Sequence, residues 1–479
     1  EQLYNLILDK DIKTYLVGGV VRDLFLDRKI NDYDFVLEKD IGTISRQFAD
    51  LIGGSLVELD KKRGIYRIIK DDKVFDFNKM AGNNIREDLA NRDFTINALA
   101  LIFNKNTLSE IKKRNTKIKR KNKVEINHFN DFLTKMRRYL IDPFTGEKDL
   151  QQKEIKLVQS NAVTEDPLRI LRGIRLKTAL SFTIDSDTEK IMKNNVEKLN
   201  QVAEERIKDE LLKIFSCSGV HNIVKYMEEQ MGILSYFFPE ISGLHEVGQC
   251  KYHKEDVWTH SIYLLEVLEE IIEDKYFSDY ISTEEISLLK WSGFFHDIGK
   301  LNTEKTEGGK THFRGHAKVG AQIMVHKMKW LKFANKAIDY VKTLIRYHMR
   351  PLSLYIEPKV SKKAYYRFFS ATGTLTPAVC ILSAADVIST RELNGKPAKG
   401  KKYLKYIKQI LKRYDQMETN TITHYLNGEE IMDLLNLSEG PAVGRVLEKL
   451  KEAQALGKVN SRQDAIEYVK KLNIIQGFL

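Results

Sequence analysis

The spacing of apolar residues changes near residue 165, and this change limits the possible folds more than any other feature of the sequence. Before it, stretches of four to six residues are typical of strands; these are 13–17, 32–37, 66–69 and 74–77. After it, apolar residues recur at helical spacing; the clearest stretches are 168–180, 207–215, 260–273, 285–296, 317–331 and 336–348. The pattern predicts an α+β multidomain chain, with a small mixed or antiparallel sheet first and helices throughout the rest.

Charge and cysteine content narrow the classes of protein. The 479 residues carry a net charge of +12, which favours a polyanionic partner. Three widely spaced cysteines form no metal-type cluster, so we expect a reducing, cytoplasmic compartment and no disulfides. The longest apolar run that we identify, near 94–103, has about ten residues where a membrane span needs ~20, so we expect no transmembrane segment. The first residue is Glu, which leaves a removed targeting peptide open.

Most of the net positive charge comes from one segment. Residues 104–141 contain twelve Lys or Arg and three acidic residues, a net charge of +9. Apolar residues are sparse there, so we expect an exposed insertion. From the residues alone, a solvated surface loop and an electrostatic arm for nucleic acid are equally good interpretations.

A glycine pair lies where a strand is expected to turn into a helix. Gly18 and Gly19 follow the first predicted strand, and Arg22 follows three residues later. Glycine lets a backbone approach a ligand closely, and a helix N-terminus favours an anion. The segment therefore predicts a phosphate contact, although such a pair is often only a turn.

Three aspartates lie on predicted strands. Asp32 and Asp34 are two residues apart, so on a strand they share one face. Asp76 lies between two phenylalanines on another strand, where a buried carboxylate needs a partner. We expect the three to hold Mg²⁺, and two such ions can activate a 3′-hydroxyl and neutralise a leaving pyrophosphate. Asp-x-Asp alone is more often a polar strand edge.

Five motifs then follow one another in order: Gly18-Gly19-Val20-Val21-Arg22-Asp23, Asp32-Tyr33-Asp34, Arg92-Asp93-Phe94-Thr95-Ile96-Asn97-Ala98, Asp142-Pro143-Phe144 and Glu165-Asp166-Pro167-Leu168-Arg169. Over about residues 14–215 the chain closely resembles the class II tRNA nucleotidyltransferases, the CCA-adding enzymes, and their bacterial poly(A) polymerase relatives.

The resemblance implies a polymerase-β-type palm and assigns roles to single residues. It implies Mg²⁺ at Asp32 and Asp34, and ribose contact by Arg92 and Asp93. Phosphate contacts are implied near the glycine pair and Arg22. The chain departs from the family at Asn91, where the family usually has arginine, so the role of that position is open.

In this family the segment beginning at Glu165 acts as a protein template. Cytosine and adenine present an amino donor beside a ring-nitrogen acceptor, which matches a carboxylate next to a guanidinium; uracil and guanine present the opposite pattern. Glu165, Asp166 and Arg169 share one helical face, and Arg172 extends it. From spacing alone, an N-cap at Asp166 before Pro167 and an ordinary ion pair are the commoner explanation.

Histidines gather in the second half of the chain. Their order with two aspartates resembles that of HD-domain metallophosphohydrolases, which implies a metal site formed by His260, His296, Asp297, His316, His348 and Asp386. Such a ligand set suits Mg²⁺, Mn²⁺, Fe or Zn²⁺. The resemblance implies phosphohydrolase activity on nucleotide phosphates; a vestigial helical domain that only shapes an RNA-binding surface is the alternative. His312 completes a His-x-x-x-His pair with His316, and we expect His245, His253 and His326 outside the ligand set.

We therefore expect four parts: a nucleotidyltransferase palm at 1–150, a helical nucleotide-recognition and RNA-binding neck at 151–240, an HD-type helical domain at 241–392, and a basic linker with a helical tail at 393–479. Tyr403, Tyr406 and Tyr414 lie among lysines, and core tyrosines are a commoner explanation than RNA stacking.

The expected activity is addition of C, C and A from CTP and ATP to the 3′ end and acceptor arm of tRNA, with no membrane partner. CC-only, A-only or poly(A) addition by the same catalytic residues is the alternative. A further alternative is an HD phosphohydrolase whose other half only binds a regulatory nucleotide. The oligomeric state cannot be predicted from the sequence.

Overall fold

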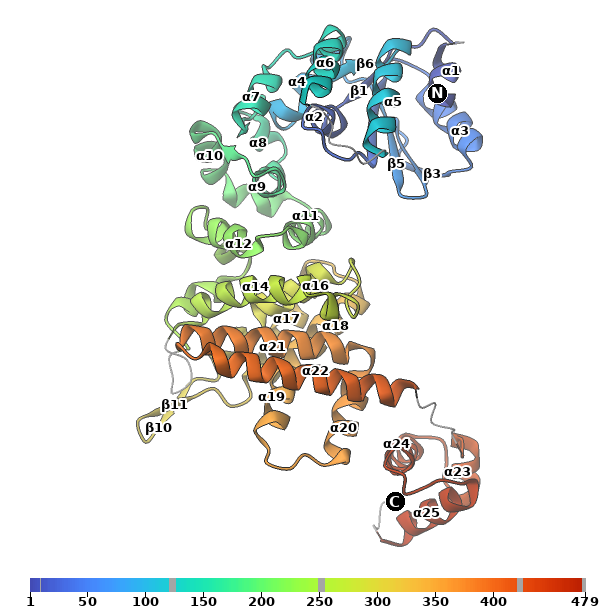
Figure 1. Ribbon diagram of the computed structural model, residues 1–479, viewed down its shortest axis with the longest axis vertical. Helices are drawn as coiled ribbons and strands as arrows, with labels where there is room; N and C mark the ends of the chain where they lie inside the picture. The colour runs from blue at the N-terminus through green and yellow to red at the C-terminus, as the bar shows by residue number, and fades with distance from the viewer. Residues whose placement is uncertain (9, 120–125, 249–254, 420–424, 476–479) are drawn as a thin grey trace. The chain divides into compact units, whose positions relative to one another are not determined.

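The computed structural model describes residues 1–8, 10–119, 126–248, 255–419 and 425–475 (Figure 1). The chain forms two compact units, residues 1–210 and 211–479, with helix α11 (Glu204–Ser216) crossing the boundary. The expected α+β class is confirmed, because the sheet lies in the first unit and helices make up nearly all of the second.

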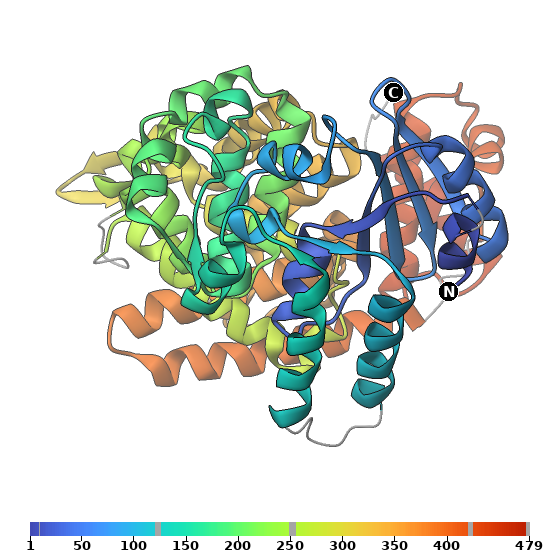
Figure 2. The same ribbon diagram turned by 90° about the horizontal axis from the view of Figure 1, so that it is seen from above.

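A seven-stranded sheet organises the first unit (Figure 2). Its order is β3-β4-β5-β2-β1-β6-β7, and all neighbouring strands are antiparallel except β2 and β5. The strands are β1 (Thr14–Val17), β2 (Asp32–Leu37), β3 (Ser55–Asp60), β4 (Ile65–Lys70), β5 (Lys73–Lys79), β6 (Ala100–Ile102) and β7 (Leu140–Ile141). Alternation along β2 sends Phe35 into the core and leaves the aspartates on the opposite face.

Helices surround this sheet and continue beyond it. They are α1 (Gln2–Leu8), α2 (Gly19–Phe25), α3 (Ile41–Ile52), α4 (Ile85–Ala90), α5 (Lys105–Lys119), α6 (Ile126–Met136), α7 (Gly146–Gln152), α8 (Ala162–Glu165), α9 (Arg169–Leu180) and α10 (Ser186–Lys193). A short parallel pair, β8 (Glu154–Ile155) and β9 (Thr183–Ile184), flanks α9. Buried Ile170, Leu171 and Ile174 recur at helical spacing on the inner side of α9.

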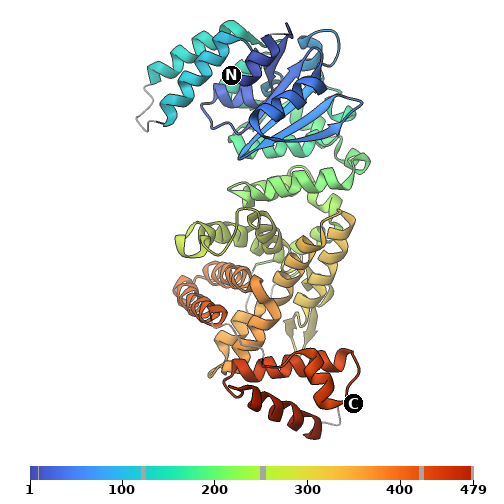
Figure 3. The same ribbon diagram turned by 90° about the vertical axis from the view of Figure 1, so that its right-hand side faces the viewer.

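The basic insertion is a helical hairpin, α5 and α6 lying side by side (Figure 3). Its base is packed rather than exposed: Ile111, Phe132 and Met136 are buried in the sheet's core. The guanidinium of Arg114 is also buried and lies 2.8 Å from Asp27. The expectation of a fully exposed insertion is therefore wrong for its base, while residues 120–125 fall outside the described part of the chain.

The second unit is helical. Its helices are α12 (Val220–Glu229), α13 (Ile233–Phe237), α14 (Val257–Glu273), α15 (Lys275–Ser278), α16 (Ile286–Phe295), α17 (His316–Trp330), α18 (Asn335–Tyr347), α19 (Met349–Ile356), α20 (Lys362–Thr372), α21 (Thr376–Leu393), α22 (Pro397–Thr419), α23 (Gly428–Leu435), α24 (Pro441–Ala455) and α25 (Arg462–Ile475). A hairpin of β10 (Lys305–Glu307) and β11 (Lys310–His312) interrupts them. The last three helices enclose a small core of their own.

Sequence analysis did not identify one stretch that is both long and apolar. The stretch 362–393, which includes α21, has an 18-residue window with a mean hydropathy of 1.5, enough by length and composition to cross a membrane. However, 72% of that window is buried inside the protein, so α21 is a core helix of its unit. Only a three-residue turn separates it from α22, which packs along it, and Tyr403 and Tyr414 of α22 are buried.

Candidate functional site

The three predicted metal-binding aspartates lie on neighbouring parallel strands. Asp34 on β2 is the direct partner of Asp76 on β5, and Asp32 lies two residues before Asp34 on the same face. The pKa of Asp34 is raised to about 6, mainly by burial; the charges of Asp76 and Asp32 act in the same direction, and those of Arg92 and Arg67 oppose them. Because the charges of two neighbouring carboxylates act against ionisation of Asp34, a cation bound beside them would stabilise the group.

Asp76 has a partner that sequence analysis did not find. Arg67, opposite it on β4, donates Nε–H and Nη2–H to the two carboxylate oxygens, both at 2.7 Å. The pairing follows from strand register, which no local motif encodes. In the part of the chain that the structure describes, the three-residue groups with ligand atoms within 4.8 Å of one another are both in the helical unit. The aspartates are therefore more widely spread, although their oxygen donors fit Mg²⁺.

A cavity of about 380 Å³ opens beside Asp34 and brings together most of the predicted nucleotide-binding residues. Its lining consists of Gly18, Gly19, Arg22, Asp34, Arg92, Asp93, Asn97, Asp166, Arg169, Arg172, Arg175 and Leu176. Asp32, Asp76 and Glu165 are not part of this lining. Eight cationic or carboxylate side chains from distant parts of the first unit thus meet in one polar hollow, as recognition of a charged ligand requires.

The glycine pair lets the backbone approach the cavity. Gly18 has a φ of +73°, which side-chain-bearing residues rarely adopt. A Cβ there would lie 2.8 Å from Nη1 of Arg92. The glycine therefore makes room for an arginine that is itself held by Asp88, 3.1 Å from its Nη2.

Buried Asp93 organises the arginines around it. Its carboxylate accepts hydrogen bonds from Nε of Arg172 at 2.8 Å, from Nδ2 of Asn97 at 3.1 Å and from the Phe94 N–H at 2.8 Å. Burial alone raises the pKa of Asp93, but Arg172 and these hydrogen bonds lower it more, so the net pKa is below the ordinary value. Asn97 in turn accepts from Nη1 of Arg22 at 2.7 Å.

The side chains of the predicted template residues form hydrogen bonds with other residues and not with one another. Asp166 accepts hydrogen bonds from Nη2 and Nη1 of Arg206 at 2.8 and 3.3 Å. Arg169 donates to the carbonyl oxygens of Asn91, at 2.6 Å, and of Ala162, at 3.2 Å. Oδ1 of Asp166 accepts a hydrogen bond from the Leu168 N–H at 3.3 Å, as an N-cap before Pro167 would, although α9 itself begins at Arg169 with Leu168 at its N-cap. Arg206 belongs to α11, and sequence analysis did not identify its contact with Asp166.

Glu165 stands apart from this pair. It ends α8 and accepts a hydrogen bond from Nδ2 of Asn161 at 2.8 Å, at an exposed position. Asn91, where the family usually has arginine, ends α4, and its backbone carbonyl holds Arg169.

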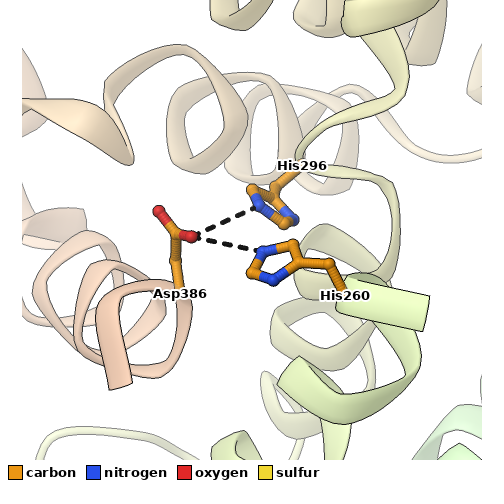
Figure 4. Close-up of side chains that lie close together, drawn as sticks. All are labelled: His260, His296 and Asp386. Atoms are coloured by element: carbon orange, nitrogen blue, oxygen red, sulfur yellow. Dashed lines mark ion pairs between the residues drawn. The ribbon is translucent and has the colours of Figure 1, made fainter. Parts of the chain in front are cut away.

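The predicted HD residues come together at the centre of the helical unit. Asp386 on α21 lies 3.3 Å from His260 on α14 and 3.9 Å from His296, which follows α16 (Figure 4). Asp297 lies 3.2 Å from Nε2 of both His296 and His316, one carboxylate oxygen toward each. His348 completes the group, its Nε2 3.3 Å from that of His316.

Backbone carbonyls set the direction in which three of these rings point. Nδ1 of His296, His316 and His348 lies 2.7–2.9 Å from the carbonyl oxygen three residues earlier in each case. If Nδ1 donates to that carbonyl, Nε2 is the free acceptor nitrogen and faces the aspartates. Nε2 of His296 is buried and lies 3.2 Å from Asp297 and 3.9 Å from Asp386, as expected of a ligand atom. The donor set of four histidines and two carboxylates fits a divalent metal.

Charges in this cluster are strongly coupled. Burial lowers the pKa of His348 to about 3, and His296 and His316 act in the same direction. Burial would raise the pKa of Asp297, but His296 and Lys300 lower it well below its ordinary value. Neutral His348 beside an ionised aspartate is the protonation state that metal ligation requires.

The other histidines lie outside this cluster. His312 on β11 pairs with Glu307 at 3.2 Å, and His326 is exposed. The ring of His245 packs against Trp258. His253 falls outside the described residues.

Comparison with family models finds three matches along the chain. Residues 14–84 match the poly A polymerase head domain, 181–244 match the probable RNA and SrmB-binding site of polymerase A, and 257–391 match the HD domain. The matches follow the same order as the motifs, and the HD match contains all six clustered residues.

Full-length relatives exist among characterised proteins. The CC-adding tRNA nucleotidyltransferase of Thermus thermophilus is 30% identical over 94% of this chain and 91% of its own length. The A-adding tRNA nucleotidyltransferase of Deinococcus radiodurans is 28% identical over 95% and 94%. The multifunctional CCA protein of Legionella pneumophila is 26% identical over 71% and 75%.

Solved structures support the fold. An apo CCA-adding enzyme superposes with a TM-score of 0.59 at 20% identity, covering 100% of this chain and 94% of its own. A CCA-adding enzyme in complex with ATP gives a TM-score of 0.57 at 19% identity, over 98% and 94%.

Proposed function

The chain belongs to the tRNA nucleotidyltransferase family, and on this premise we propose that it adds nucleotides from CTP and ATP to the 3′ end of tRNA without a nucleic acid template. The observation that carries the proposal is the cavity in which Asp34, the glycine pair, Asp166 and Arg169 meet. The proposed partners are the tRNA 3′ end with its acceptor arm and the two nucleotides, in the cytoplasm. We also propose that the chain has four parts: the nucleotidyltransferase palm at 1–150, the helical neck at 151–240, the HD-type domain at 241–392, and the basic linker with the helical tail at 393–479.

In the proposed reaction, the tRNA 3′-oxygen attacks the α-phosphorus and pyrophosphate leaves. Asp32, Asp34 and Asp76 would hold two Mg²⁺ ions, which when bound supply charge neutralisation and a more acidic 3′-hydroxyl. Arg22 and the glycine pair are suited to bind the triphosphate, because they line the cavity beside Asp34. Arg92 and Asp93 remain the proposed ribose contacts, and Asp93 also fixes Arg172.

We propose that base selection rests on Asp166 and Arg169, which line the cavity, with Glu165 as a third contact from outside this lining. The carboxylate of Asp166 and the guanidinium of Arg169 can pair with the polar edge of cytosine or adenine. Uracil and guanine would leave hydrogen-bond donors and acceptors of these side chains unpaired. A site that hydrogen-bonds its ligand can reject such analogues by ~10⁴ or more.

Members of this family differ in how many nucleotides they add to the tRNA. The relatives from Thermus thermophilus and Deinococcus radiodurans, which align with over nine tenths of this chain, are a CC-adding and an A-adding enzyme. We therefore retain CC-adding, A-adding and poly(A) activity as alternatives to complete CCA addition. The test is extension of three labelled tRNA transcripts, ending before CCA, after C and after CC, with each nucleotide singly and with all four.

Extension of all three transcripts to CCA, followed by arrest, supports complete addition. Stopping at CC, acting only on the CC-ended transcript, or continued addition of A identifies the other enzymes. No extension of any transcript overturns the proposal.

The helical unit supports a second candidate activity, hydrolysis of nucleotide phosphates. The specific observation is the six-residue cluster, in which all the expected ligand types converge. The divalent metal held there is proposed to be Mg²⁺ or a transition metal. Asp297→Ala should remove phosphohydrolase activity and spare nucleotide addition, and Asp34→Ala should do the reverse. Equal loss of both activities in either variant would contradict two separate sites.

A further inference from the structure

A residue outside the cavity holds one of its two proposed base-selecting side chains. Arg206 lies on α11, is 53% exposed at its side chain and is not part of the cavity lining. Its two terminal nitrogens contact the two oxygens of Asp166 at 2.8 and 3.3 Å. A planar guanidinium that meets both oxygens of a carboxylate fixes the plane of that carboxylate.

The anchoring of Asp166 is independent of Arg169. Arg169 donates to two backbone carbonyls, those of Asn91 and Ala162, and thus takes its direction from α4 and α8. Each of the two side chains therefore has its own support, and a change at Arg206 would act on Asp166 first.

The helix that carries Arg206 is itself fixed against α9. One turn further along α11, buried Glu210 accepts a hydrogen bond from Nε of Arg175 at 2.7 Å. Arg175 belongs to α9, the helix that Arg169 begins. Arg206 thus projects from a rigid position, as a residue must if it is to orient another within a few tenths of an ångström.

We propose that Arg206 is a positioning residue for base selection: it holds the Asp166 carboxylate in the plane where one oxygen meets the exocyclic amino group of cytosine or adenine. This inference rests on the proposed function. An Asp166 that could rotate would accept from that amino group less well, and would oppose the carbonyl oxygen of uracil or guanine less strongly. Losing Arg206 should therefore weaken discrimination rather than the chemical step itself.

The experiment compares wild type with Arg206→Met, Arg206→Lys and the control Lys213→Met, which removes an exposed positive charge from the same helix. Single-nucleotide addition to tRNA transcripts gives kcat and KM for CTP, ATP, UTP and GTP. For Arg206→Met we expect the preference for CTP over UTP to fall about ten- to a hundredfold, mainly through a higher KM for CTP. Arg206→Lys should restore part of this preference, and Lys213→Met should keep all of it.

A second substrate tests whether Arg206 acts through the amino group. The triphosphate of 2-pyrimidinone riboside lacks the exocyclic amino group of CTP. Wild type should use it much less well than CTP, and this penalty should shrink in Arg206→Met. Circular dichroism and thermal unfolding show whether each variant is folded, and Arg206→Lys replaces Arg206→Met if the latter is not.

Two outcomes separate the inference from its premise. If wild type adds nucleotides but Arg206→Met lowers kcat/KM equally for all nucleotides, with the amino-group penalty unchanged, Arg206 is only structural and the inference fails. If wild type adds no nucleotide to any transcript, the proposed function fails instead.

Discussion

At the scale of single residues, much of the chemistry depends on where one side chain meets another. Gly18 illustrates this, because its positive φ and the nearby Arg92 guanidinium both exclude a Cβ. Gly219 offers a matched position, with a φ of +69° and nothing within 4 Å of an added Cβ. The two glycines therefore separate backbone strain from displacement of Arg92.

We expect Gly18→Ala and Gly219→Ala each to lower the free energy of unfolding by about 1 kcal/mol, since both bring alanine into the left-handed region. Only Gly18→Ala should also raise the KM for nucleotide, because it moves Arg92. Denaturant unfolding and steady-state kinetics measure the two effects. An unchanged KM in Gly18→Ala would remove Arg92 from the nucleotide site.

Asp34 lowers the stability of the metal-free protein. Its folded pKa of about 6 lies above the ordinary 3.8, so the folded state favours the protonated form. Below the ordinary pKa the residue has no effect; as pH rises past 6, the ionised carboxylate costs roughly 3 kcal/mol. With chelator present, Asp34→Asn should be more stable than wild type at pH 8 and equal to it near pH 3.5.

Thermal unfolding at the two pH values measures this difference. Mg²⁺ should stabilise wild type at pH 8 more than Asp34→Asn, reversing or shrinking the gap. If Asp34→Asn is less stable than wild type at both pH values, the carboxylate is part of the scaffold rather than a metal ligand.

The residues that sequence analysis missed share one property. Arg67 and Arg206 each reach an aspartate from a separate element, so neither forms a local motif with it. The aspartates were identifiable because their neighbours along the chain carry the pattern. Their arginine partners depend on strand register and helix packing, which the spacing of residues does not encode.

At the scale of helices and strands, the sequence predicted where these elements occur better than it predicted what they pack against. The hairpin of β4 and β5 and the six helical stretches after residue 165 lie within a few residues of their predicted positions. The basic insertion was misjudged because the few apolar residues near its base pack together into the core. Charge dominates its composition, yet Ile111, Phe132 and Met136 are enough to anchor it.

The packed base of this insertion predicts a clear energetic difference. Phe132→Ala should lower the free energy of unfolding by about 3–5 kcal/mol, as expected for a large buried ring. Asn130→Ala on the exposed side of the same helix should change it by less than about 0.5 kcal/mol. Denaturant unfolding checks both, and an equal small effect would mean that the hairpin is not part of the core.

At the scale of the whole molecule, the two candidate sites belong to different compact units, which allows each to be tested separately. The first unit ends at Glu210 and contains the entire cavity. The metal cluster draws on α14, α17 and α21 of the second unit and on the residues that follow α16 and α18. The fold of both units was predictable; the oligomeric state was not, because nothing in the sequence marks an interface.

Because the cluster joins several helices, a bound metal should stabilise the second unit. At a concentration 100 times its Kd, a divalent ion contributes about 2.7 kcal/mol. We expect Mn²⁺ to raise the unfolding temperature of wild type and of Asp339→Asn, an exposed acid on α18, but not that of Asp386→Asn. Calorimetry with and without chelator measures the shift, and the same shift in Asp386→Asn would contradict the assigned ligands.

The apolar character of α21 has a consequence during protein synthesis. In the folded unit, α21 packs mainly against α14 and α22. When α21 leaves the ribosome, α14 is already complete, whereas α22 is translated next. At 5–20 residues per second, the 23 residues of α22 follow within a few seconds. A nascent chain that stalls between α21 and α22 would expose an apolar segment of the kind that targeting and quality-control factors recognise. The three-residue turn after α21 keeps that interval short.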